Sequence, residues 1–73
     1  MLTQIEQFVI DRVKQMRIER GMSQAELANK LDVANSFIGQ AESSKYRTKY
    51  NLNHLSKLVV IFNCDYREFF PNP

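Results

Sequence analysis

The stretch from Ser23 to Ala41 constrains the fold more than any other part of the chain, because it encodes two short helices with a very short turn between them. Ser23 and Glu26 have the spacing of a capping box, which begins many helices. The apolar stripe that follows at helical spacing consists of Leu27, Ala28 and Leu31. We therefore predict a helix over Gln24–Leu31.

Asp32 and Val33 occupy the predicted turn. A helix commonly ends on a residue in the left-handed region, where glycine is most frequent and aspartate is one of the few alternatives. Val33 is apolar and can fill the corner between the two helices. Apolar residues then recur at i, i+3, i+4 and i+7, namely Ala34, Phe37, Ile38 and Ala41. This spacing predicts a second helix from Ala34 or Asn35 to Ser43.

The opposite face of this second helix is polar but uncharged. It carries Asn35, Ser36, Gly39, Gln40 and Ser43. In a chain with 25% charged residues, a solvated helix face normally contains Lys and Glu. Amide and hydroxyl side chains can exchange hydrogen bonds with base edges in the major groove of DNA, and a glycine permits close approach of a partner. The pattern favours a DNA-reading face over the alternative, a plain surface helix.

A basic segment, SKYRTKYN, follows directly at Ser44–Asn51. It has no apolar periodicity, which predicts a loop or short turn. Lys45, Arg47 and Lys49 alternate in it with hydroxyl-bearing residues, and it contains no acid. Such a segment suits a phosphate backbone beside a groove. The alternative is a charged, solvated loop, but the neutral face just before it favours phosphate contact.

Ser23–Ala41 resembles the helix-turn-helix of the phage Cro and repressor type, also called the xenobiotic-response-element (XRE) family. The resemblance extends from about Val13 to Phe70 and includes the sequence pattern GMSQAELANKLDV. The residues that carry it are Gln24, Leu27, Ala28, Leu31, Asp32, Val33, Ile38 and Glu42. It implies an all-α, five-helix, lambda-repressor-like fold, with the helix-turn-helix at helices 2 and 3 of a single domain over residues 1–73.

The resemblance also implies sequence-specific binding of double-stranded DNA, with the third helix in the major groove and the second across the backbone. The expected base-reading residues are Asn35, Ser36, Gly39 and Gln40. The expected phosphate contacts are Gln24, Ser43, Lys45, Tyr46, Arg47 and Lys49. The family pairs an Arg at the position of Arg17 with the Glu at the position of Glu42. Such a pair would neutralise Glu42, the only acid between Asp32 and Asp65.

Ala34 departs from the family pattern, which places the Ser or Thr N-cap of the third helix at this position. Alanine cannot cap a helix through its side chain. Either the cap therefore shifts to Asn35 or the helix start frays. If Asn35 caps, its role with bases is in doubt, and Ser36 and Gln40 are the firmer candidates.

Three further helices are predicted around the helix-turn-helix. The first runs from a capping box at Thr3 and Glu6 to Arg20, with Gly21 as its stop. Its expected buried stripe is Ile5, Phe8, Val9, Val13 and Met16. The fourth helix spans Leu52–Phe62 between Asn51 and Asn63. Its expected core residues are Leu52, Leu55, Leu58, Val59 and Phe62, with His54 solvated. A third capping box, Asp65 and Glu68, predicts a last helix over Tyr66–Phe70.

One small domain buries too little DNA surface for tight specific binding, so we expect a homodimer on a two-fold operator with half-sites about one helical turn apart. We expect no separate dimerisation domain, so the dimer is expected to use the domain's own surface. The candidates are Val60, Tyr66, Phe69 and Phe70, because helices four and five carry more apolar surface than so small a core needs.

Charge and composition exclude several other classes of protein. A net charge of +2 permits a polyanionic partner. One cysteine, Cys64, and one histidine cannot build a disulfide or a metal cluster, which fits a reducing cytoplasm. The longest apolar run, Leu58–Phe62, is too short for a membrane span. We expect no cofactor, no metal, no small-molecule ligand and no membrane partner.

Two other functions fit the sequence less well than a small, repressor-like transcriptional regulator. An enzyme has little support, because no motif ties a nucleophile to a base. An antitoxin, or another protein-interaction module with the same fold, would favour acids on the third helix and the following loop. This chain shows the reverse, although an antitoxin that also binds its operator would look the same.

Overall fold

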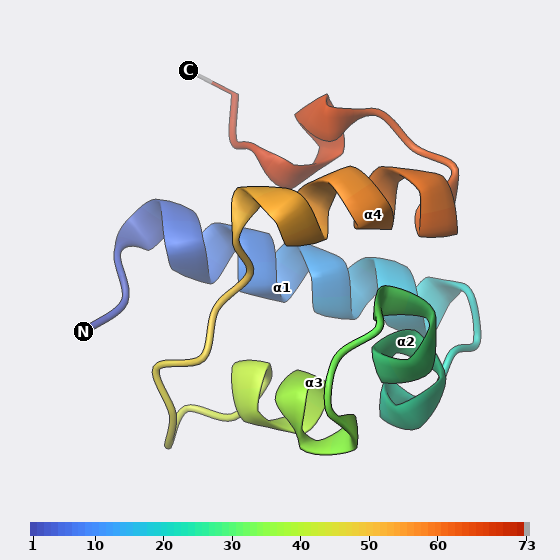
Figure 1. Cartoon of the computed structure of the whole chain (residues 1–73). Coiled ribbons are helices and arrows are strands. Elements are labelled where there is room, and N and C mark those ends of the chain that lie inside the picture. Colours follow the sequence, from blue (N-terminus) through green and yellow to red (C-terminus); the bar gives the residue numbers. More distant parts are fainter. Residues whose placement is uncertain (73) are drawn as a thin grey trace.

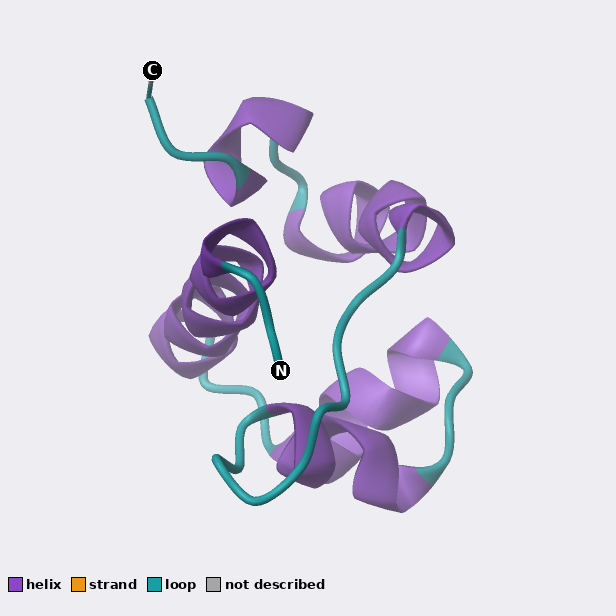
Figure 2. Cartoon of the chain, turned by 90° about the vertical axis from the view of Figure 1, so that its left-hand side faces the viewer, coloured by secondary structure: helices purple, strands orange, loops and turns teal. Residues whose placement is uncertain are grey.

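The computed structural model describes residues 1–72 and is all-α, as predicted. It contains the α-helices α1 (Gln4–Glu19), α2 (Gln24–Leu31), α3 (Asn35–Ala41) and α4 (Leu52–Phe62), followed by the short 3₁₀ helix η1 (Tyr66–Phe69). In Figure 1, α1 crosses the middle of the molecule, with α4 and η1 on one side and α2 and α3 on the other. Figure 2 shows the segment between α3 and α4 running up the near side to the start of α4.

Side-chain caps begin three of the helices where the sequence predicted them. The side chains of Thr3, Ser23 and Asn51 accept the backbone N–H three residues on, at 3.2, 3.0 and 2.8 Å. In the first two cases the Glu6 and Glu26 carboxylates accept the backbone N–H of the cap residue. These pairs satisfy N–H groups that a helix start otherwise leaves without partners.

Left-handed residues end the same helices. Gly21 follows α1 with φ of 66°, Asp32 ends α2 at 61° and Asn63 ends α4 at 52°. The left-handed region costs most side chains energy, and the short polar side chains of Asp and Asn tolerate it best after glycine. The predicted turn between α2 and α3 and the predicted end of α4 are therefore confirmed.

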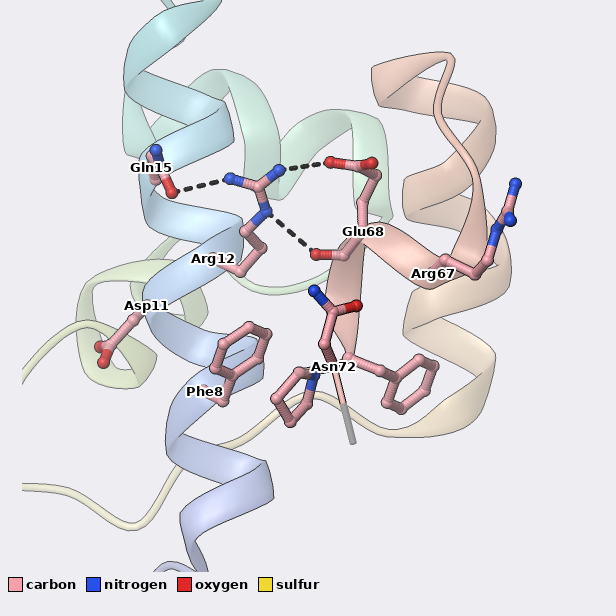
Figure 3. A pocket seen from close by; sticks show the side chains of 9 residues that line it. Phe8, Asp11, Arg12, Gln15, Arg67, Glu68 and Asn72 are labelled. Carbon is pink, nitrogen blue, oxygen red and sulfur yellow. Dashed lines mark hydrogen bonds and ion pairs between the residues drawn. The ribbon is translucent and has the colours of Figure 1, made fainter.

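The predicted capping box at Asp65 is wrong. Asp65 accepts the backbone N–H of Arg67, two residues on, at 2.9 Å. The segment winds as a 3₁₀ helix, whose tighter turn brings the second residue rather than the third to the cap. Glu68 instead pairs with Arg12 of α1, whose Nε also donates to the Glu68 carbonyl at 3.0 Å (Figure 3). The fifth helix is thus a single turn fastened to α1.

The core is apolar and draws on every helix. Its largest fully buried side chains are Phe69, Ile10, Leu27, Leu31, Ile38, Leu58 and Val13. Phe69 is 0% exposed, because η1 packs against both α1 and α4. Its predicted role in a dimer contact is therefore wrong: the chain's own core uses this ring.

Three predicted core residues lie on the surface instead. Leu52 is 78% exposed, Ile5 43% and Phe8 37%. The first turns of α1 and α4 lie at the same edge of the molecule (Figure 1), and no further helix within residues 1–72 covers them there. Ile5 and Leu52 line one shallow apolar groove together with Phe70. The apolar stripes predicted for α1 and α4 are present, but their N-terminal residues extend beyond the small core and remain exposed.

An aromatic cluster joins the loop after α3 to the core. The Phe37 ring contacts the Tyr50 and His54 rings edge-on, with centroids 5.8 and 5.0 Å apart. Tyr50 is buried, although it lies in the segment that the sequence predicted to be a loop or short turn without an apolar pattern. His54 was predicted to be solvated, but it is half-buried and its Nδ1 accepts the backbone N–H of Asn51 at 3.0 Å.

Candidate nucleic-acid interface

The relative position of α2 and α3 is fixed by buried apolar side chains and a closed turn. Leu27, Ala28 and Ile38 are all fully buried. Alanine at a helix crossing allows the two backbones to approach closely. The Val33 N–H donates to the Ala28 carbonyl at 3.0 Å and closes the turn around Asp32. The two helices therefore form one rigid unit, as a helix-turn-helix requires.

The ion pair expected between Arg17 and Glu42 is present. Arg17 Nε and Nη2 donate to the two Glu42 carboxylate oxygens, each at 2.9 Å. The two side chains are only 10% and 4% exposed. Arg17 Nη1 also donates to the Met22 carbonyl at 2.7 Å. One guanidinium thus fastens α1 to the end of α3 and to the turn before α2, in a bidentate geometry that resists rotation.

The predicted reading residues lie on the outer side of α3. Asn35 and Ser36 are exposed, and Gly39 and Gln40 are half-buried. Ala34 occupies the N-cap position with extended backbone and makes no side-chain capping bond. Asn35 is the first residue inside the helix, so the cap does not shift to it. Asn35 therefore has no capping role, and its amide is exposed next to Ser36.

Gln40 is tied to the loop that follows α3. Thr48 Oγ1 donates to Gln40 Oε1 at 3.4 Å. The amide nitrogen of Gln40 has no such partner within residues 1–72. Thr48 is half-buried on a segment that continues directly into the buried Tyr50. The loop and the amide side chain of α3 are therefore connected by a contact that the sequence did not predict.

Gln24 bridges the start of α2 to the end of α3. Its Nε2 donates to Glu42 Oε1 at 3.1 Å, so Glu42 accepts from Gln24 and Arg17 together. Its Oε1 lies against Gly39, where a Cβ atom would approach it to 3.2 Å. Gln24 is still exposed to solvent. The side chain expected to contact a phosphate thus also holds the two helices together.

The loop after α3 presents part of its predicted phosphate-binding set to solvent. Lys45, Tyr46 and Arg47 are exposed, and neither cation forms an ion pair within residues 1–72. Ser43 is half-buried and its Oγ accepts the Lys45 backbone N–H at 3.3 Å. Lys49 differs, because its Nζ reaches Glu6 Oε2 of α1 at 3.0 Å.

Titratable groups near this surface follow their surroundings. Burial raises the pKa of the Tyr50 hydroxyl, and the nearby Glu42 carboxylate raises it further. Burial and, secondarily, Lys57 lower the pKa of His54. The Thr3 backbone N–H and then Lys49 lower the pKa of Glu6. Near neutral pH the phenol and the imidazole are therefore uncharged, and the loop's cations set the charge of the surface.

A second cleft lies between α1 and the C-terminal segment (Figure 3). Arg12, Gln15 and Glu68 line it, and Arg12 bridges its two sides. Its lining residues come from α1 and residues 67–72, away from the helix-turn-helix. No group of His, Cys, Asp and Glu side chains suited to a metal ion occurs within residues 1–72. Within the same range, no helix has both the length and the apolar character needed to cross a bilayer.

Comparison with known proteins gives a consistent result. Residues 13–69 match the profile of a helix-turn-helix family. No curated protein sequence matches the chain. Among solved structures, the fold is similar to SinR, the master regulator for biofilm formation, in a crystal structure in complex with DNA. The two sequences are 30% identical, the TM-score is 0.69, and the match covers 84% of this chain and 95% of the SinR chain.

Proposed function

The chain belongs to the helix-turn-helix family of the Cro and repressor (XRE) type, and from this we propose that it is a sequence-specific DNA-binding protein that regulates transcription. The observation that carries the proposal is the outer face of α3. This face presents amide and hydroxyl groups without a charge, and the exposed cations Lys45 and Arg47 follow it. A polyanion with hydrogen-bonding base edges is the partner that this combination suits best.

In this arrangement α3 enters the major groove and α2 lies across the backbone. Asn35, Ser36 and Gln40 read base edges. Gln40 donates through its amide nitrogen, and its carbonyl oxygen, which accepts from Thr48, keeps a second lone pair. Glu42, the only acid in α3 and the loop that follows it, is paired with Arg17 and nearly covered. The surface can therefore approach a duplex without placing an unpaired carboxylate against it.

Phosphates are bound at both ends of the helix-turn-helix. Gln24 offers its second amide N–H beside the unpaired backbone N–H groups of the first turn of α2, a favourable place for an anion. Ser43, Lys45, Tyr46 and Arg47 hold the backbone on the other side of the groove. Lys49 contributes less, because binding a phosphate would require it to leave Glu6.

We propose that the chain binds as a homodimer on a two-fold operator. One domain of this kind contacts few base pairs, and two copies on adjacent half-sites supply the affinity that a single one lacks. Exposed apolar residues available for the contact include Ile5, Leu52, Val60, Tyr66 and Phe70. Ile5 and Leu52 join this surface in place of the buried Phe69, because they line one groove together with the predicted candidate Phe70.

Selection from a random pool of duplexes tests the proposal. The wild-type chain is expected to enrich a short motif repeated with two-fold symmetry, its halves about one helical turn apart. Sedimentation at micromolar concentration is expected to show a dimer, and Leu52→Lys is expected to shift it toward monomer. A chain that enriches no motif at low salt would contradict DNA reading. An enriched motif without symmetry, bound by a strict monomer, would contradict the dimer alone.

A further inference from the structure

Gly39 lies inside a helix that gains nothing from the backbone freedom of glycine. It is in the middle of α3, and its φ is not positive. A glycine at such a position lowers helix stability relative to alanine. The glycine is therefore best explained by the limited room for a side chain at this position. A Cβ atom at Gly39 would lie 3.2 Å from Gln24 Oε1, closer than most real contacts of this kind.

The orientation of the Gln24 amide is determined by its neighbours. Glu42 Oε1 accepts from Gln24 Nε2 at 3.1 Å, and a carboxylate cannot accept from the amide oxygen. The oxygen must therefore point the other way, toward Gly39. One amide N–H remains unused. It belongs to the first residue of α2, where the backbone N–H groups of the helix start also lack helical partners.

We propose that Gly39 is a positioning residue: by lacking a side chain, it lets Gln24 dock between α3 and Glu42, so that the remaining amide N–H of Gln24 is aimed at one DNA phosphate. Gly39 then acts on DNA through Gln24 and makes no base contact of its own. The inference rests on the proposed function, because it assigns a role within that same interface.

The proposal predicts that the effects of Gly39 and Gln24 are not additive. In Gly39→Ala the new methyl group forces the Gln24 amide to shift by a few tenths of an ångström. If this misaligns the amide N–H, affinity for the selected duplex is expected to fall about threefold to tenfold, the effect of one hydrogen bond. Gln24→Ala is expected to lose a similar factor. Adding Gly39→Ala to Gln24→Ala is expected to cause no further loss, because the methyl group then meets open space. The base preference of all three variants is expected to match wild type.

The experiment measures all four proteins against the duplex that the wild-type chain enriches, and against copies carrying one uncharged methylphosphonate linkage at successive positions. Wild type is expected to lose affinity at the linkage that Gln24 contacts. Gln24→Ala and Gly39→Ala are both expected to lose this sensitivity while keeping sensitivity at the phosphates bound by the loop. A purely structural weakening of the fold would reduce binding to every duplex equally.

A parallel measurement does not depend on DNA. Urea denaturation of the four proteins is expected to show that Gly39→Ala raises the midpoint more in the Gln24→Ala background than in wild type, because only there is the helix-forming gain unopposed. Equal midpoint shifts in both backgrounds would overturn the contact itself.

Two binding results would overturn the positioning role. One is that Gly39→Ala loses the same factor in both backgrounds, and the other is that it changes the base preference. Either would mean that Gly39 faces the DNA directly. A wild-type chain that enriches no duplex would instead refute the proposed function, and the denaturation result would still decide whether Gly39 makes room for Gln24.

Discussion

Glu42 contributes both to the stability of the fold and to the proposed DNA-binding surface. It is the only acid between Asp32 and Asp65, and it accepts hydrogen bonds from Arg17 and Gln24 while remaining almost covered. A buried ion pair adds little net stability over an apolar replacement, but removing one partner leaves an uncompensated charge. The pair therefore holds α1, α2 and α3 in one arrangement rather than simply strengthening the fold.

Replacing Glu42 with alanine is expected to lower the free energy of unfolding by about 3 kcal/mol, because Arg17 would remain buried without its partner. Urea denaturation measures this loss. Arg67→Ala is the matched control, because the Arg67–Asp65 pair is exposed and its removal should leave the unfolding free energy essentially unchanged. Equal effects in the two variants would contradict the special position of the Arg17–Glu42 pair.

Tyr50 carries a buried hydroxyl without a hydrogen-bond partner within residues 1–72. Removing such a group while keeping the ring should raise the free energy of unfolding by about 1 kcal/mol. Tyr50→Phe tests this in thermal or urea unfolding. The control is Tyr46→Phe, whose hydroxyl is on an exposed ring and whose loss should change little. A marked destabilisation by Tyr50→Phe would show that the hydroxyl has a partner.

At the scale of elements, α3 is the helix with the weakest start. Its N-cap, Ala34, already has extended backbone, with φ of −60° and ψ of 147°, but provides no side-chain acceptor. Ala34→Ser is therefore expected to raise the free energy of unfolding by about 1 kcal/mol. The converse variant, Ser23→Ala, should lose a similar amount by uncapping α2. No gain from Ala34→Ser in thermal unfolding would contradict the capping geometry.

The start of α4 makes the fold sensitive to pH. Burial and Lys57 lower the pKa of His54 below its ordinary value of 6.5, so the unfolded chain binds a proton that the folded chain resists. The contribution of His54 to stability is therefore fully present above pH 6.5 and is lost as the pH falls below it. Protonation also removes the Nδ1 acceptor that caps Asn51.

Replacing His54 with glutamine tests this dependence. Glutamine preserves the capping-box acceptor but does not titrate. The free energy of unfolding of the wild-type chain is expected to decrease between pH 7 and pH 5.5, and that of His54→Gln to decrease less. Identical pH profiles would assign the dependence to other groups.

Local chemistry explains which elements were predictable from the sequence. Caps at Thr3, Ser23 and Asn51 and left-handed ends at Asp32 and Asn63 depend on one turn of chain, and each lies where the sequence predicted it. The failures concern relations between distant segments. Leu52 has the right spacing for the core stripe, but nothing in the spacing shows that its turn extends past the last covering helix.

The candidate site also contains features that were predictable from the sequence and contacts that were not. The spacing of α3 predicted which side chains face outward, and family resemblance supplied the Arg17–Glu42 pair. The contacts of Gln24 with Glu42, of Thr48 with Gln40 and of Lys49 with Glu6 were not predictable. Each of these contacts joins segments that come together only through the packing of the helices. A sequence pattern does not contain the distances between such segments.

At the scale of the whole molecule, the chain separates two kinds of surface. The outer face of α3 and the loop after it form a polar and cationic side. The first turns of α1 and α4 form an apolar edge with Phe70, which is open in one copy of the chain. None of the residues that line the groove at this edge belongs to α3, so the homodimer that we propose could close the edge without covering the outer face of α3.

The central claim is that the outer face of α3 reads DNA, and the affinity of Gln40→Ala tests it most directly. Against the duplex that the wild-type chain selects, this variant is expected to lose about 1–3 kcal/mol and its preference at one base pair in each half-site. Gln15→Ala, on the cleft between α1 and the C-terminal segment, is the control and should bind as wild type. Unchanged affinity and preference in Gln40→Ala would contradict the claim.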